Sequence, residues 1–152
     1  MAGRRTAQRL DRTAHEGEDG GVRYAIRLDR TVRARHAVKL PNGRLEAMHE
    51  HLWRICVTVG REELDGSGMV MDFGTLEQLV WQIVGPMTDR VLNEMDPFKG
   101  DRADYPSPTA ECVARWIGTT LCGQLPSDVR LCEVRVVEAP GCTAIFRPEP
   151  GR

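Results

Sequence analysis

The sequence predicts an α+β domain in which a four-stranded antiparallel sheet carries two helices on one face. Apolar and polar residues alternate in the first and last thirds of the domain, as they do in half-buried strands. Between these regions, two runs of apolar residues recur at helical spacing. The element order is therefore ββααββ, which is typical of helices packed on one face of a sheet.

The first 21 residues precede this domain. They contain several arginines but few apolar residues, and they end in a run of glycines and acids. A segment with so little to bury is predicted to be a disordered tail, and it has no apolar stretch that would make it a secretory signal. We therefore expect one domain over residues 22–150, which suits a chain of 152 residues.

The first strand pair is predicted from period-two alternation. One strand is expected over residues 22–38, with a break at Asp29-Arg30, and the next over residues 48–59. The loop at 40–47 between them contains a Pro-Asn-Gly turn signal. The natural pairing of two strands joined by such a loop is antiparallel.

Two helices follow. The first is expected to begin after Asp72 as its N-cap and to end at Gly85-Pro86. A long irregular stretch at 94–106 is of the kind that is often functional. The second helix is expected to begin with Ser107 as its cap and Pro108 at its first position.

A final hairpin is expected from two alternating segments at 131–138 and 142–147. An Ala-Pro-Gly turn signal lies between them. This hairpin completes the four predicted strands.

Composition excludes several classes of protein. The net charge is −1, so no overall field attracts nucleic acid, and no apolar run approaches the roughly 20 residues that span a bilayer. The five cysteines never form a C-x-x-C pair, which argues against a disulfide framework and against a thiolate zinc site. We expect a cytoplasmic protein with reduced thiols.

Three histidines are predicted to lie close together. His49 and His51 are two residues apart on a strand, so their imidazoles project from one face. His36 lies on the paired strand, in the same face set as Ala34. Three imidazoles without a fourth protein ligand suit Zn²⁺ with an open coordination position, which is the catalytic pattern. Spacing alone leaves open that the three histidines are unrelated.

Six short segments, taken in order, carry a resemblance to a known family. The chain resembles the 6-pyruvoyl-tetrahydropterin synthase and 6-carboxytetrahydropterin synthase family over about residues 22–147. The matching segments are Ala34-Arg35-His36 for A-x-H, His49-Glu50-His51 for His-Gly-His, residues 68–73 for G-x-V-x-D-F, residues 89–93 for D-H-x-x-L-N, residues 108–111 for P-T-x-E, and the late Glu138.

The resemblance implies a fold and a set of partners. The fold is the tunnelling fold, and subunits of the family assemble as a dimer of trimers with active sites between them. The resemblance also implies a zinc ion on His36, His49 and His51, and 7,8-dihydroneopterin triphosphate as substrate. A homo-oligomer, either a trimer or a hexamer, is therefore expected, with no nucleic acid or membrane partner.

The same resemblance assigns substrate contacts. Glu138 holds the position of a glutamate that anchors the pterin ring, because a carboxylate can accept two hydrogen bonds from the edge of the ring. Without the resemblance, Glu138 would be taken as a surface glutamate of an edge strand. Thr109 and Glu111 match the pterin-contacting segment, although at a helix start either residue can simply serve the cap and the dipole.

The proton relay of the family is absent. Leu45 stands where most members have a cysteine, and Arg90 replaces the histidine of the partner pair, leaving Asp89 as its remaining member. An arginine cannot act as a base at neutral pH. Glu46, three residues before His49, matches a subgroup with glutamate in an E-x-x-H-x-H motif, so it is the candidate general base. The alternative is a solvated loop carboxylate. Asp89 is the second catalytic candidate, and its alternative is a plain surface ion pair with Arg90.

Two further positions depart from the pattern. Glu50 replaces a glycine between two of the histidines, and Leu52 replaces a polar residue after them. Glu50 is expected on the opposite face of the strand from the histidines, so it is not a predicted ligand.

The sequence thus predicts a zinc-dependent lyase acting on dihydroneopterin triphosphate or a related pterin. A 6-carboxytetrahydropterin synthase, whose product feeds queuosine-type deazapurine synthesis, is the first expectation. Glu46 favours an alternative on mechanistic grounds, namely side-chain cleavage to a 6-hydroxymethyl pterin. A 6-pyruvoyl product and a non-catalytic protein that binds zinc and pterin are further alternatives.

Overall fold

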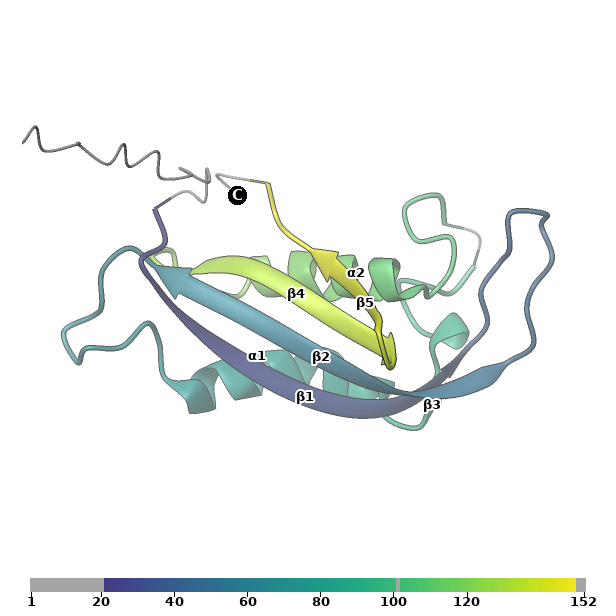
Figure 1. Cartoon of the computed structure of the whole chain (residues 1–152), viewed down its shortest axis with the longest axis horizontal. Helices are drawn as coiled ribbons and strands as arrows, with labels where there is room; N and C mark the ends of the chain where they lie inside the picture. Colours follow the sequence, from purple (N-terminus) through teal and green to yellow (C-terminus); the bar gives the residue numbers. More distant parts are fainter. Residues whose placement is uncertain (1–20, 101, 150–152) are drawn as a thin grey trace, which may run out of the picture.

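The computed structural model describes residues 21–100 and 102–149 (Figure 1). Of the predicted disordered tail, only Gly21 falls within the described residues, so the prediction for residues 1–20 lies outside them. The strands and helices are β1 (Tyr24–His36), β2 (His49–Arg61), α1 (Phe73–Val84), β3 (Arg90–Val91), α2 (Ala110–Cys122), β4 (Arg130–Ala139) and β5 (Cys142–Phe146), with short 3-10 turns η1 (Gly85–Met87) and η2 (Leu92–Glu94).

The strands form one sheet in the order β3-β1-β2-β4-β5, and both helices lie behind the same face of it (Figure 1). The long strands pair antiparallel, as predicted. The fifth strand, β3, was not predicted, because it pairs in parallel with only Ala34 and Arg35 and is too short to show a period. The α+β class with two helices on one face is confirmed.

The predicted break at Asp29-Arg30 is wrong, because β1 is continuous from Tyr24 to His36. Arg30 occupies a helix-facing position, opposite Ile55 of β2, and forms an ion pair with Glu77 of α1. Its aliphatic stem lies over the edge of the core while the guanidinium reaches the acid. A charged residue in the apolar stripe therefore does not interrupt the strand.

The starts of the two helices differ in how well they were predicted. Asp72 caps α1 as expected, because its carboxylate accepts a hydrogen bond of 2.8 Å from the Thr75 N–H. The predicted cap of α2 at Ser107 is wrong. Thr109 caps this helix by accepting a hydrogen bond of 3.2 Å from the Cys112 N–H. Ser107 instead accepts a hydrogen bond from the Lys39 N–H, so its hydroxyl serves a tertiary contact.

The core fills the space between the sheet and the two helices. Every second residue of β2 from Trp53 to Val59 is fully buried on the helix-facing side, as are Val134 and Val136 of β4. The facing helices contribute further buried side chains: Leu76, Val80, Ile83, Val84, Val113, Ile117 and Leu121. No helix in the described part of the chain is long and apolar enough to cross a membrane.

Candidate metal centre

The antiparallel register of β1 and β2 brings three histidines together at one end of the sheet. His36 and His49 are direct partners across the ladder, and His51 lies opposite Ala34. The centroid of the His36 ring lies 4.6 Å from that of His49 and 5.2 Å from that of His51, and the centroids of His49 and His51 are 4.8 Å apart. The three imidazoles therefore converge on one small volume.

His36 is fully buried, and its hydrogen bonds fix which nitrogen carries the proton. Its Nδ1 lies 2.8 Å from the Pro108 carbonyl oxygen, which can only accept, so Nδ1–H is the donor. Burial lowers the pKa of His36, which favours the neutral ring. The Nε2 atom then carries a lone pair, and it is a buried atom without a hydrogen-bond partner.

The same arrangement holds the second histidine. His49 Nδ1 donates to the Ala47 carbonyl at 2.8 Å, which leaves its Nε2 free to act as a ligand. Beneath the cluster, Trp53 is fully buried, and its indole packs edge-on against His36 and His51. The Trp53 Nε1–H donates to the Ala34 carbonyl at 3.2 Å, so the floor of the site is itself fixed to β1. Such outer contacts orient metal-binding imidazoles.

A carboxylate joins the three imidazoles. Glu138 Oε1, from the end of β4, lies 2.9 Å from His36 Nε2 and 3.7 Å from His51 Nε2. One ligand atom from each of the three histidines and Glu138 lies within 4.8 Å of all the others, and this is the group in the described residues that can hold a metal. Imidazole nitrogens with one carboxylate oxygen form a donor set that zinc prefers. Together with the unpartnered His36 Nε2, this donor set fits a zinc ion.

Glu46 lies at the rim of the cluster. Its Oε1 accepts a hydrogen bond of 2.9 Å from the Val38 N–H and is 3.8 Å from His49 Nε2. The Glu46 N–H in turn donates to the Val38 carbonyl at 3.0 Å. These contacts hold the carboxylate, which is 30% exposed, beside the histidines. The preceding residue, Leu45, is 58% exposed.

Three other candidate residues lie outside the cluster of four. Asp89 is exposed, has a left-handed φ of 59° and forms an ion pair of 3.7 Å with Arg33. Thr109 uses its hydroxyl as the N-cap of α2, and Glu111 is exposed in the first turn of that helix. The catalytic role of Asp89 and the pterin contacts of Thr109 and Glu111 stay predictions.

Sequence reasoning missed the residues that fix the end of β1. The Asn93 side chain accepts from the Ala37 N–H at 2.9 Å and donates to the Ala37 carbonyl at 2.8 Å, so it replaces a partner strand directly after His36. Ser107 and the Pro108 carbonyl hold Lys39 and His36 from the other side. Asn93 and Pro108 stand in two of the matched motifs, but a motif does not tell which backbone group a side chain binds.

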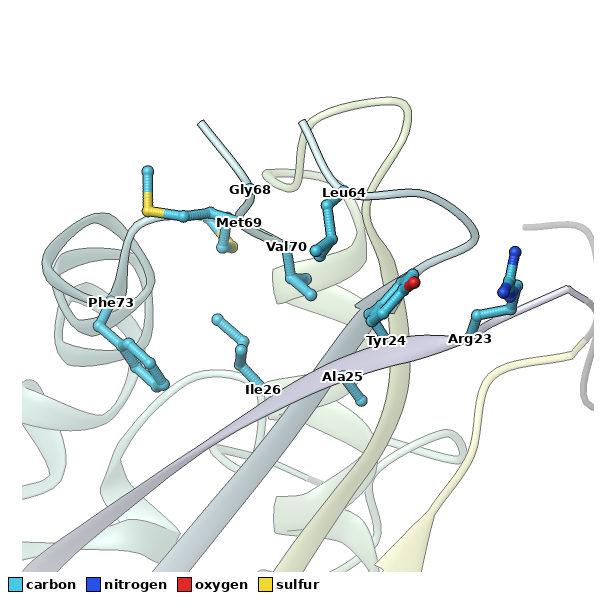
Figure 2. A pocket seen from close by; sticks show the side chains of 10 residues that line it. Arg23, Tyr24, Ala25, Ile26, Leu64, Gly68, Met69, Val70 and Phe73 are labelled. Atoms are coloured by element: carbon cyan, nitrogen blue, oxygen red, sulfur yellow. The ribbon is translucent and has the colours of Figure 1, made fainter. Parts of the chain in front are cut away.

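Two hollows lie at opposite ends of the sheet. One, of about 420 Å³, adjoins the cluster and is lined by His51, Leu52, Glu138 and the start of the β4–β5 turn. The other, of about 540 Å³, lies where β1 begins, between that strand, the 64–71 loop and the first residue of α1 (Figure 2). Its lining is apolar apart from Arg23 and the Tyr24 hydroxyl, and Phe73 faces it from α1 (Figure 2).

Comparison with known sequences gives a consistent result. A profile described as 6-pyruvoyl tetrahydropterin synthase matches residues 25–149. The chain is 28% identical to the 6-carboxy-5,6,7,8-tetrahydropterin synthase of Bacillus subtilis over 132 residues, which cover 84% of this chain and 88% of that protein. It is 34% identical to the dihydroneopterin monophosphate aldolase of Pyrococcus furiosus over 98 residues, covering 64% and 75% of the two chains.

Solved structures share the fold. The 6-pyruvoyl tetrahydropterin synthase of Caenorhabditis elegans matches with a TM-score of 0.63 at 20% identity, over 84% of this chain and 99% of the other. The 6-pyruvoyltetrahydropterin synthase of Plasmodium vivax, in a variant whose catalytic glutamate is replaced by cysteine, matches with a TM-score of 0.67 at 15% identity, over 82% and 97%. At these identities the likeness concerns the fold.

Proposed function

The chain belongs to the 6-pyruvoyl tetrahydropterin synthase family, and we propose that it is a zinc-dependent lyase acting on the side chain of dihydroneopterin triphosphate or a related pterin. The observation that carries this proposal is the convergence of His36, His49 and His51 beside the carboxylate of Glu46. The donor set also adjoins a hollow of about 420 Å³, which His51 and Glu138 line and whose size is typical of small-molecule sites.

His36, His49 and His51 would hold the zinc ion through their Nε2 atoms. When bound, zinc orients the side-chain hydroxyl groups of the substrate and, as a Lewis acid, eases the removal of protons from them or from the carbons that bear them. The protein's own contribution is to orient the imidazoles. The Pro108 and Ala47 carbonyls accept the Nδ1 protons of His36 and His49, so the Nε2 lone pairs face the cluster.

Glu46 is proposed as the general base of a carbon–carbon cleavage. It removes the proton from the second side-chain hydroxyl, the bond between the first and second side-chain carbons breaks, and the second carbon leaves as an aldehyde. The electron pair passes into the dihydropterin ring, and protonation of the first carbon gives a 6-hydroxymethyl pterin. No oxidant is required, and the proton held by Glu46 is available for return.

Two relatives support this reaction. The Pyrococcus furiosus protein is named an aldolase, and a glutamate is named as a catalytic residue of the Plasmodium vivax enzyme. The chain has no cysteine at the cluster in its described part, and its five cysteines lie elsewhere. A carboxylate therefore takes the place that a thiol would hold at this rim.

A second candidate is a 6-carboxytetrahydropterin synthase, whose product would feed queuosine-type deazapurine synthesis. The Bacillus subtilis relative supports it, because the match covers more of both chains than the match to the aldolase. The two candidates share the metal site and the substrate class. They differ in the product.

Further residues are assigned by proposal. Thr109 and Glu111 would contact the pterin ring, and Glu138 would do so when it is not engaged at the cluster. Asp89 lies outside the cluster of its own chain, so its proposed catalytic role would be exercised at the site of a neighbouring subunit.

The proposal includes a homo-oligomer, a trimer or a hexamer, in the cytoplasm. In the described residues, β3 pairs only with Ala34 and Arg35, so the outer edge of β1 before Arg33 meets no other strand. Exposed apolar side chains surround the hollow at the start of β1, among them Tyr24, Met69 and Phe73. An open edge beside apolar surface is a suitable place for a second copy to pair.

One experiment tests the proposed function. Purified protein is assayed for bound zinc and incubated with dihydroneopterin triphosphate, and the pterin products are resolved by mass. A 6-hydroxymethyl product that is lost in Glu46→Gln supports the cleavage reaction, and a 6-carboxy product supports the second candidate. Zinc without turnover, and no effect of Glu46→Gln, would leave a non-catalytic binding protein.

A further inference from the structure

Glu138 is an acidic residue that follows a stripe of buried apolar residues on one face of β4. Val134 and Val136 of β4 are buried against the helices, and Glu138 follows at the same alternation. It lies one residue beyond the last pair of the β2–β4 ladder, Arg54 and Val137, where the β4–β5 register also shifts. This irregular strand end places an acid among three imidazoles.

The contact between His36 Nε2 and Glu138 Oε1 is close but is not a hydrogen bond. The atoms are 2.9 Å apart, yet Nε2 has no hydrogen-bond partner, and the ring donates from Nδ1 to the Pro108 carbonyl. An imidazole nitrogen and a carboxylate oxygen are both ligand atoms for a metal cation. The pair is therefore placed as two ligands of one ion would be.

The distances from Glu138 to two of the histidines agree with this arrangement. Two ligands about 2.0–2.2 Å from a tetrahedral zinc ion are about 3.3–3.6 Å from each other. Glu138 Oε1 lies 2.9 Å from one histidine nitrogen and 3.7 Å from another, on either side of that range.

Glu46 provides the contrast. Its Oε1 is bound by the Val38 N–H and lies 3.8 Å from a single histidine, and Glu46 is not part of the cluster of four. The two acids at the rim of the site are thus differently placed. Glu138 lies among the imidazoles, whereas Glu46 is held beside them.

We infer that Glu138 is the fourth protein ligand of the metal ion in the resting site, so that the site is closed by the chain itself until substrate oxygen displaces the carboxylate. This inference rests on the metal site of the proposed function and deepens it. It also separates two states of Glu138, because a carboxylate bound at the metal is not available to the far edge of a pterin ring. Substrate entry would release Glu138 into the adjoining hollow, which it lines.

The test uses Co²⁺ as a spectroscopic substitute for zinc in the full-length protein, without substrate. Sodium azide is the probe of an open coordination position. The visible absorption of the Co²⁺ wild-type protein should be insensitive to azide, whereas that of Glu138→Gln should change as azide enters the vacated position. A wild-type spectrum that responds to azide as readily as the Glu138→Gln spectrum would overturn the inference.

Zinc affinity gives a second, independent readout, measured by competition with a chromophoric chelator. Glu138→Gln should bind zinc at least about tenfold more weakly than the wild type, since even an outer partner of a ligand contributes about 10–100-fold. Glu46→Gln, the matched control, should stay within about threefold, well below that range. Equal affinities of the two variants would count against the inference.

The outcomes separate this inference from the proposed function. If the wild-type protein binds neither Co²⁺ nor zinc, there is no metal site, and both the proposed function and the role of Glu138 are refuted. If the wild-type protein binds zinc, turns over substrate and responds to azide, only the role of Glu138 as a ligand is refuted.

Discussion

The two ends of the β1–β2 ladder have the same backbone pairing but different side chains. At one end, His36 faces His49 across the ladder, and at the other, Tyr24 lies opposite Arg61, about 40 Å away along the strand. The histidine end gathers four ligand atoms within 4.8 Å of one another, next to a hollow of about 420 Å³. The tyrosine end borders a larger hollow, of about 540 Å³, which is lined mostly by apolar side chains together with Arg23 and Tyr24 (Figure 2).

The size of a hollow alone therefore does not identify a site of chemistry. At the histidine end, polar side chains converge. The Nδ1 atoms of His36 and His49 are hydrogen-bonded to the backbone carbonyls of Pro108 and Ala47. At the tyrosine end, no such group of ligands forms among the described residues. The second hollow suits a covering apolar surface better than a reacting molecule.

The largest expected effect comes from removing a histidine. His49→Ala should weaken zinc binding by at least about 100-fold, because it deletes a ligand rather than an outer partner, and should abolish product formation. Chelator competition and the pterin assay measure both. Met69→Ala, at the other end of the ladder, is the control and should bind zinc like the wild type.

Removing the candidate base should separate catalysis from metal binding. Glu46→Gln is expected to lower kcat by about 10²–10⁴, the usual contribution of a general base, while zinc content stays at the wild-type level. Steady-state kinetics and metal analysis on the same preparation check this. An unchanged kcat would show that Glu46 is a solvated carboxylate of the loop.

The residues that hold the end of β1 should matter for both stability and affinity. Asn93→Ala leaves the Ala37 N–H and carbonyl without partners, which should cost about 1–3 kcal/mol in the free energy of unfolding. Zinc affinity should fall by about 10–100-fold as His36 loses its fixed position.

Asn42→Ala is the matched control for this variant. The Asn42 side chain makes an exposed hydrogen bond to the Arg44 N–H in the 40–47 loop. Denaturant unfolding and chelator competition should show no comparable loss. Equal effects of the two asparagine variants would contradict a special role for Asn93.

Acid should destabilise the metal-free protein through the histidine end. Burial lowers the pKa of His36 below 6.5, so as pH falls through about 6.5 the unfolded chain takes up a proton that the folded chain does not. The free energy of unfolding should therefore fall with acid, by at most about 1.4 kcal/mol per pH unit for this one group.

Denaturant unfolding between pH 7.5 and 5, with and without His36→Gln, measures this dependence. The variant should have a flatter profile. Asp65, whose pKa is lowered by the N–H groups of Met69 and Ser67, titrates in a more acidic window and does not interfere. A wild-type profile as flat as that of His36→Gln would show that His36 does not cause the loss of stability in acid.

The smallest effect is expected at the tyrosine end. Phe73→Ser should leave zinc affinity unchanged and shift the oligomer toward smaller species, because it adds a polar group to the apolar surface around the hollow. Size-exclusion chromatography with light scattering measures the mass. A monomeric wild-type protein would refute the role of this surface in assembly.

Much of the fold followed from local pattern. Alternation in β1 and β2, the Asp72 cap and the final hairpin were all readable, because each depends on neighbours a few residues away. The same holds for the three histidines, since a single loop joins their two strands and sets the register. The break at Asp29-Arg30 and the cap at Ser107 were wrong because Glu77 and Lys39, distant in sequence, determine what Arg30 and Ser107 do.

The position of Glu138 could not be read from local pattern. Its strand, β4, pairs with β2 only after the chain has passed through both helices, so their register is set by the packed core. Asn93 is similar, because its partner, Ala37, lies 56 residues earlier. The histidines were therefore predictable as a cluster, whereas the residues that surround them were not.

The dependence of turnover on zinc is the most direct test of the proposed function. Wild-type protein is stripped with a chelator, assayed with dihydroneopterin triphosphate, and assayed again after zinc is restored in steps. We expect about one zinc ion per chain, loss of the pterin product on stripping, and recovery in proportion to zinc bound at the three histidines. Product formation that is unaffected by stripping, or by His49→Ala, would refute the zinc-dependent reaction.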